Sequence, residues 1–301
     1  MTLRVASFQN LEQFLRYNEA SGAEQASVLE RLSTLKKVNR ASDEPDHYRR
    51  IKDAHTDISE QGAFLDNIES LQSRFRIVED SLASIRDSID RVRELAIQGS
   101  SFIYDDSERE TMADEIEQIR LSVMNQLNNT HEGEYLFSGT LNTTQPFQDP
   151  VTGAYSGNLE TIEVRISRTD TITANFTGEE IAFGATGQGG AEDILDVMDD
   201  LVVAFRANST AAISAEIPRL RPAAERVGQL VSEVGTRSLR LISEETRYAE
   251  FEENLRATLS KLEDADLAEE AVNLEKVNAT IDAQLRSSGS IGRRSLFDFL
   301  G

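Results

Sequence analysis

Residues 241–262 read LISEETRYAEFEENLRATLSKL, and a large apolar residue stands at every seventh position of this stretch. The same step continues toward the N-terminus without a break, so that the full series is Ile213, Leu220, Val227, Val234, Leu241, Tyr248, Leu255 and Leu262. Such a period is typical of a helix that packs lengthwise against another helix. The pattern therefore predicts one long helix with a buried seam and a polar outer face.

A second long helix is predicted from Asp46 to about Gly99, where no proline occurs and only Gly62 interrupts the helix-forming residues. Its seven-residue series is Ile68, Phe75, Leu82, Ile89 and Ala96, beside Leu71, Val78, Ile85 and Val92. At 1.5 Å per residue this helix would be about 75 Å long. Ser107 followed by Glu110 resembles a capping box and predicts the start of a third helix, which would form a hairpin with the second.

Between about residues 132 and 190 the helical period gives way to strand and turn signals. Apolar residues alternate in TIEVRI (161–166) and TITANF (171–176), and Pro146, Pro150 and DPVTG mark turns. We expect a small β-rich insert that ends at the glycine-rich, flexible segment GATGQGG, residues 184–190. Helical residues return at AEDILDVMDDLVVAF. The predicted fold is mainly α, a long coiled-coil rod built from N- and C-terminal segments with a β-rich insert.

Both ends of the chain carry helical patterns with incomplete apolar seams. Near the N-terminus, Phe8, Leu11 and Leu15 precede the polar and small stretch NEASGAEQAS. Near the C-terminus the seam consists of Leu267, Leu274 and Ile281, with Ala271, Val277 and Leu285 beside them. Because isolated short helices are marginal in water, we expect the two ends to pair and neighbouring copies to complete the pair.

The last residues, SLFDFLG, include four large apolar side chains, those of Leu296, Phe297, Phe299 and Leu300. A free tail of this kind would expose an aggregation-prone patch. Two alternatives follow from the residues: the tail folds back onto its own helix, or another protein covers it.

The composition excludes several classes of protein. A net charge of -22 argues against binding to nucleic acid or to an anionic membrane. The absence of cysteine excludes disulfides and thiolate chemistry. The N-terminus has no apolar core of a secretory signal, and no stretch approaches 18 apolar residues. We therefore expect a soluble chain that keeps its N-terminus.

No enzyme motif is complete. The segment HEGEY at 131–135 begins like the zinc motif HExxH, but Tyr135 replaces the second histidine. In GAYSG, Ala154 replaces the first glycine of a nucleophile elbow. The segment GATGQGGAED lacks the lysine of a phosphate loop, and Glu192 and Asp193 would repel phosphate. We expect no catalytic residue, no bound metal and no cofactor.

Several segments resemble the bacterial flagellin family: DRVRELAIQGSS (90–101) with DDSERE (105–110), LEDADLAEEAVNLEKVNATID (262–282) and NRASDEPDHY (39–48). Two further segments, GEYLFSGTLNTTQPF (133–147) and SLFDFL (295–300), are similar to the members that join the hook to the filament. The resemblance spans nearly the whole chain. Glu44, His47 and Tyr48 depart from the family pattern around Pro45.

This resemblance implies an extracellular structural protein of the flagellum, exported through the flagellar secretion channel without a cleaved signal. Its partners would be hook-associated protein 1, flagellin, neighbouring copies of itself and an export chaperone on the C-terminal segment. Residues 1–40 and 262–301 would form terminal coiled coils, residues 41–131 and 191–261 the rod, and residues 132–190 the outer domain. A minor or divergent filament flagellin, a coiled-coil adhesin or scaffold, and an enzyme with an acidic active site are the alternatives.

Overall fold

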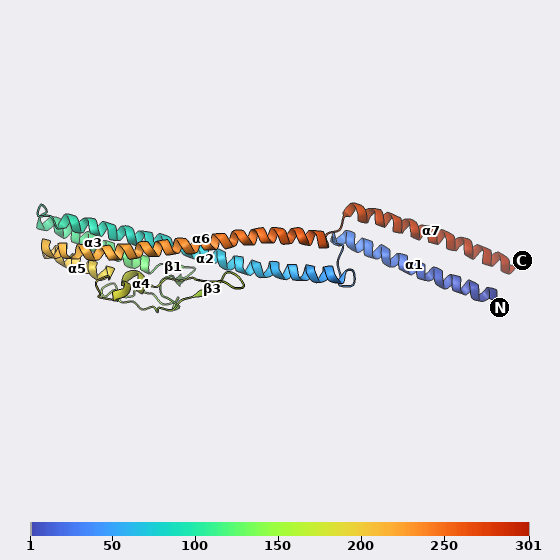
Figure 1. The fold of residues 1–301 in the computed structure, drawn as a ribbon, viewed down its shortest axis with the longest axis horizontal. Coiled ribbons are helices and arrows are strands. Elements are labelled where there is room, and N and C mark those ends of the chain that lie inside the picture. Colours follow the sequence, from blue (N-terminus) through green and yellow to red (C-terminus); the bar gives the residue numbers. More distant parts are fainter. Residues whose placement is uncertain (1, 301) are drawn as a thin grey trace. The chain divides into compact units, whose positions relative to one another are not determined.

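The computed structural model describes the backbone of residues 2–300 and the side chains of residues 12–287. It confirms a mainly α fold with a small β-rich insert (Figure 1). The long helices are α1 (Thr2–Thr34), α2 (Pro45–Gly99), α3 (Asp106–Leu127), α5 (Ile194–Arg206), α6 (Thr210–Glu263) and α7 (Leu267–Leu300).

The chain forms two compact units. Unit 1 consists of residues 1–60 and 250–301, and unit 2 consists of residues 61–249. Helices α2 and α6 each contribute residues to both units, because the boundaries between the units fall within these two helices. The sequence-based division into terminal, rod and outer segments stays a prediction about the assembled protein.

In unit 2, the seven-residue series of α2 and α6 lie in one continuous apolar core. The predicted rod residues of this unit are buried, namely Ile68, Phe75, Leu82, Ile89, Val227, Val234, Leu241 and Tyr248. Leu255, the last predicted rod residue, belongs to unit 1, where it is half-buried against a smaller core. The buried seams of both helices therefore belong to the same core.

Two prolines, Pro218 and Pro222, lie inside α6 without ending it. Proline removes one backbone donor and normally disrupts a helix interior. Both rings are exposed. The two residues are four positions apart, so the donor that Pro222 lacks would have bonded to the carbonyl of Pro218. On an exposed face, water can satisfy that carbonyl.

Helix α3 begins earlier than its predicted cap. The N-cap is Asp105, whose side chain accepts a hydrogen bond from the Glu108 backbone N–H at 2.8 Å, while Glu108 accepts from the Asp105 N–H at 2.9 Å. The capping box predicted at Ser107 and Glu110 is therefore wrong by two residues. Both pairs fit the capping motif, but only Asp105 has the extended backbone that an N-cap requires.

The insert contains two short hairpins. Strands β1 (Thr130–His131) and β2 (Glu134–Tyr135) are joined by Glu132 and Gly133, both at positive φ, as a two-residue hairpin turn requires. The sequence HEGEY is thus a turn, and its histidine does not lie on a helix. Strands β3 (Glu163–Arg165) and β4 (Thr171–Thr173) form the second hairpin, followed by helix α4 (Gly178–Ala182) and a 3-10 turn (Gly184–Thr186).

The glycine-rich segment after the 3-10 turn has defined contacts, although the sequence suggested a flexible linker. The Gly189 N–H donates to the Asp193 carboxylate at 2.8 Å, and Arg219 donates to the Gly190 and Ala191 carbonyls. Asp193 is also the N-cap of α5, so that helix begins at Ile194, three residues later than predicted.

Candidate assembly interface

Helices α1 and α7 of unit 1 lie side by side (Figure 1). The sequence predicted that the two ends of the chain pair with each other, and the structure confirms this pairing. Val28 of α1 and Val277 of α7 are the two buried apolar residues in the described parts of these helices. Little apolar surface is therefore covered inside the pair.

The predicted seam residues occupy different environments. Leu274 and Ile281 are half-buried, whereas Leu15, Leu267 and Leu285 are exposed. The remaining predicted residues, Phe8, Leu11, Leu296, Phe297, Phe299 and Leu300, lie outside the described side chains. Several large apolar residues of the pair thus face solvent in a single chain, including also Tyr17, Leu29 and Val272.

Polar contacts join α1 to α7, which the apolar pattern did not reveal. The Gln25 amide donates to Asn278 at 2.6 Å, and the Gln284 amide donates to the Ser21 hydroxyl at 3.0 Å. Arg31 forms an ion pair with Glu270 at 3.0 Å. Ser21 and Gln25 belong to the stretch NEASGAEQAS, whose polar residues therefore hold the pair in register. In the sequence, the one sign of these contacts was a run of small and polar residues on a helix that was predicted to have a partner helix.

The two connections within unit 1, α1 to α2 and α6 to α7, are joined by a β-bridge between Lys36 and Asp264. The Lys37 N–H donates to the Glu263 carbonyl at 2.7 Å, and the Ala265 N–H donates to the Leu35 carbonyl at 3.0 Å. The Glu263 side chain pairs with Lys36 and lies 3.4 Å from His55. Leu35 has φ of 60°, a strained conformation for leucine, and the bridge holds it there.

The segment after this bridge is a compact turn. The Asp43 carboxylate accepts hydrogen bonds from the N–H groups of Arg40 at 2.9 Å and Asn39 at 3.0 Å. These backbone hydrogen bonds hold the pKa of Asp43 below its ordinary value. Tyr48 packs against a small core made by Val38, Ile51, Ala54 and Leu259. Of the departures from the family pattern, Tyr48 therefore has a packing role.

Within unit 2, two arginines of α6 hold the insert against this helix. Arg226 donates to the Ile181 and Ala182 carbonyls at 3.1 Å and to the Glu192 carbonyl at 2.9 Å. Arg237 donates to the Thr173 carbonyl at 2.9 Å, and its guanidinium lies 4.3 Å from the centre of the Phe176 ring. These contacts let one helix hold backbone segments that are far apart in the sequence.

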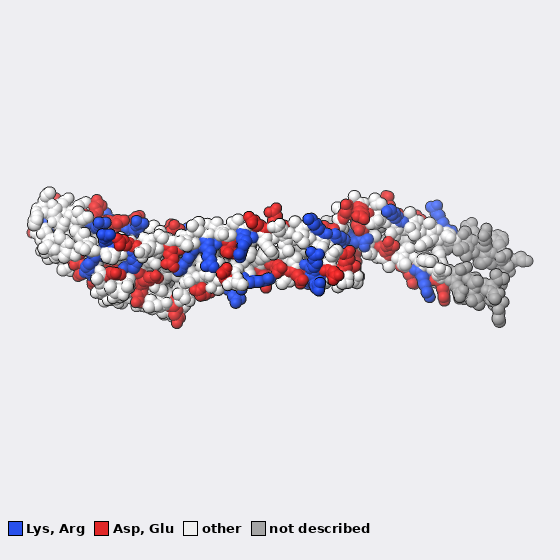
Figure 2. Space-filling view, in the orientation of Figure 1, with Lys and Arg blue, Asp and Glu red and all other residues white. Residues whose placement is uncertain are grey.

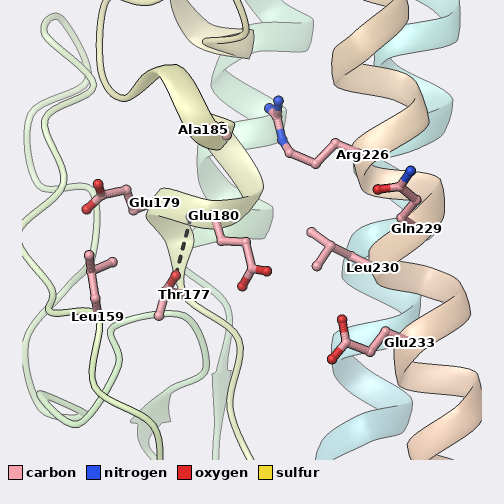
Figure 3. Close-up of a pocket in the computed structure, with 10 residues that line it drawn as sticks. Leu159, Thr177, Glu179, Glu180, Ala185, Arg226, Gln229, Leu230 and Glu233 are labelled. Atoms are coloured by element: carbon pink, nitrogen blue, oxygen red, sulfur yellow. Dashed lines mark hydrogen bonds between the residues drawn. The ribbon is translucent and has the colours of Figure 1, made fainter.

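A pocket lies beside this attachment, and Figure 3 shows Arg226 reaching from α6 toward the segment after α4. Glu180 points from α4 toward the side of α6 that carries Glu233. Burial, reinforced by the charge of Glu233, raises the pKa of Glu180 above its ordinary value. Within the part of the chain whose side chains are described, no group of three or more His, Cys, Asp or Glu residues is placed to hold a metal ion.

None of the helices, over the residues that the structure describes, combines the length and the apolar character needed to cross a bilayer.

Comparison with protein families identifies this architecture. A model of the bacterial flagellin N-terminal helical region matches residues 7–142, and a model of the bacterial flagellin C-terminal helical region matches residues 219–287. Together the two ranges cover more than half of the chain. The chain belongs to the bacterial flagellin family. Most of the insert and all of α5 lie between the two matched ranges of this flagellin-family chain.

Individual relatives indicate which members of the family this chain resembles. The flagellar hook-associated protein 3 of Salmonella typhimurium is 23% identical over 218 residues, which are 68% of this chain and 67% of the relative. The protein of the same name from Escherichia coli is 25% identical over 196 residues, 63% of this chain and 60% of the relative. The solved flagellar junction protein FlgL of Legionella pneumophila shares the fold, with a TM-score of 0.61 at 14% identity over 71% of this chain and all of that one.

Proposed function

We propose that this flagellin-family chain is a structural component of the bacterial flagellum that joins the hook, through hook-associated protein 1, to the flagellin filament. The names of its curated relatives support a place next to the hook. The observation that carries the proposal is the α1–α7 pair, whose exposed apolar residues a single chain leaves in water. Neighbouring subunits would cover them.

The energetics favour assembly through this pair. Burial of one large apolar side chain contributes about 1.5–3 kcal/mol. The exposed residues Leu15, Tyr17, Leu29, Leu267 and Val272 are each about half-exposed, so each offers roughly half of that value. Contacts with several neighbours in a tube would then make the interaction cooperative, since each copy contributes the same surfaces.

The proposal includes no chemical turnover. The chain would be exported through the flagellar secretion channel and would act outside the cell. The remaining partners are neighbouring copies of the chain and an export chaperone that binds the C-terminal segment around Leu296 and Phe299. Such a chaperone would keep the apolar tail from aggregating before export.

The test is genetic complementation of cells that lack this chain. Wild-type protein should restore filaments, whereas the variant with Leu29→Asp and Val272→Asp should not, because two charges enter the surface that neighbours cover. Flagellin should then appear in the medium. The control is Val151→Asp in the insert, where the side chain is 78% exposed. Normal filaments with the double variant would contradict the proposal, provided that both purified variants melt like the wild type.

A further inference from the structure

The turn between α2 and α3 displays two large apolar side chains. Phe102 is 90% exposed and Ile103 is 87% exposed. Ile97 in the last turn of α2 and Val203 in the last turn of α5 are exposed as well. Figure 2 shows that the visible face at this end of unit 2 is largely free of Lys, Arg, Asp and Glu. We refer to residues 100–105 as the apolar turn.

The backbone of the apolar turn is held in place by a buried arginine. The Arg109 side chain donates to the Gly99 carbonyl at 3.0 Å and to the Ser101 carbonyl at 2.7 Å. Arg109 also donates to the side chain of Asn208, just before α6. The capping box of Asp105 holds the other side of the turn. The two apolar side chains are thus presented on a preorganised backbone, which reduces the entropy lost on binding.

A second group of exposed apolar residues lies on α6, away from its buried seam. Leu239 is 68% exposed and Ile242 is 51% exposed. Gly235, one turn before Leu239, has no side chain, and a Cβ atom placed there would meet nothing within 4 Å. Steps of three and four residues place these positions on one helix face, together with Val231 and Thr246. We refer to these five residues as the α6 outer face.

The α6 outer face contains no charged residue, although 28% of the chain is charged. The charged side chains near it on α6 make contacts elsewhere. Arg240 forms an ion pair with Asp170 of the insert at 3.2 Å. Glu245 accepts a hydrogen bond from Gln72 of α2 at 2.8 Å. The face itself therefore presents no carboxylate to the acidic residues at the start of α3, which lie beside the apolar turn.

The apolar turn and the α6 outer face of one chain do not meet. Arg109 and Asn208 join the turn to the start of α6. Leu239 lies 29 residues after Thr210, the first residue of that helix, which corresponds to about 44 Å at the rise of an α-helix. Within one chain both apolar surfaces therefore stay exposed, whereas a second copy can bring one against the other.

We propose that the apolar turn of one copy docks onto the α6 outer face of a second copy. The absence of a side chain at Gly235 leaves room for the Phe102 ring beside Leu239. Ile103 then packs toward Ile242. The inference deepens the proposed function, on which it rests, by naming one contact between copies.

The symmetry of this contact suits a tubular assembly. The contact is heterologous, because two different surfaces meet, and heterologous contacts produce rings or filaments. Two α6 outer faces that met each other would instead form a closed pair, which does not extend into a tube.

The contact is small and acts together with the α1–α7 pair. One aromatic side chain buries at most about 250 Å². The few side chains of the turn and the face therefore cover less than the roughly 1,200 Å² of a stable protein interface. Dilute copies should stay separate, so the test requires a concentrated solution.

Cysteine cross-linking tests this contact directly, because the chain contains no cysteine. Ser101→Cys marks the turn, and Ser243→Cys marks the α6 outer face beside Ile242. The control, Ser122→Cys, marks an exposed position on α3. With a short thiol cross-linker in a concentrated mixture of full-length variants, Ser101→Cys should form a mixed dimer with Ser243→Cys and not with Ser122→Cys. Equal yields with the two partners, no mixed dimer, or dimers of Ser243→Cys in its place would overturn the inference.

Further variants test the role of the apolar side chains. Adding Phe102→Ser and Ile103→Ser to the turn variant should lower the yield of mixed dimer at least tenfold, because two large apolar groups no longer leave water. Adding Leu239→Ser to the α6 variant should lower the yield as well. Adding Val151→Ser in the insert should not change it. All these side chains are exposed, so each variant should melt like the wild type. Equal yields with and without the apolar residues would contradict the docking of this turn.

The contact and the proposed function can fail separately. A chain with Phe102→Ser and Ile103→Ser that restores normal filaments would refute the contact and leave the proposed function standing. A mixed dimer in solution, combined with labelling of the chain along the whole filament, would support the contact and refute the proposed function.

Discussion

Replacement of Leu241 by alanine measures how much the seven-residue seam contributes to unit 2. Leu241 lies in the middle of α6 and its side chain is 0% exposed. Truncation removes three buried carbon atoms, a loss of about 2.4 kcal/mol in transfer free energy. The cavity left behind brings the total to about 2–5 kcal/mol.

The matched control is two residues away on the same helix. Leu239 is 68% exposed, so Leu239→Ala makes the same chemical change on the opposite side of the seam. We expect its free energy of unfolding to change by no more than about 0.5 kcal/mol. Both variants keep the helix propensity of α6, since alanine is at least as favourable as leucine in a helix.

The assay is urea unfolding followed by circular dichroism at the helix band, with the slope of the transition compared between variants. Leu241→Ala should unfold at a distinctly lower urea concentration, while Leu239→Ala should follow the wild type. If both variants lost the same stability, the seven-residue series would not be the packed seam of unit 2.

Three further predictions concern single contacts. Arg226→Ala should speed amide exchange in residues 178–192 while the core around Leu241 stays protected; unchanged exchange in the insert would show that these carbonyl contacts do not hold it. Asp105→Ala should lower the free energy of unfolding by about 0.5–2 kcal/mol, whereas Ser107→Ala should leave it nearly unchanged. If urea unfolding showed the larger loss for Ser107→Ala, Ser107 and not Asp105 would be the N-cap of α3. Burial raises the pKa of Tyr155 from 10.0 to about 12, so the folded state holds this proton more tightly; its stabilising effect is present below pH 10 and is lost as the pH rises toward 12. Tyr155→Phe should therefore lose less stability than the wild type over that interval in thermal melts, and identical losses would exclude the linkage.

The sequence predicted the long helices well because their signal is repeated locally. The series through Phe75 and Val234 needs no knowledge of distant residues, since any helix with that period must bury that face. The alternation of Ile172, Ala174 and Phe176 predicted strand β4 in the same way.

Contacts between distant segments were not predictable. Arg226 is one of many charged residues on α6, and nothing near it in the sequence indicates that it binds the carbonyls of Ile181 and Ala182. The hydrogen bond between Gln25 and Asn278 was not predictable because polar side chains on a helix carry no periodic signal that distinguishes a paired residue from a solvated one. The prediction of the α3 cap failed for a different reason. Asp105 and Ser107 both satisfy the capping pattern, and only the backbone geometry distinguishes them.

Immunogold labelling of intact flagella, with an antibody raised against the insert, would locate this chain between hook and filament. We expect a single labelled band at the end of the filament next to the hook. Labelling along the length of the filament would contradict it and would identify the chain as a filament flagellin.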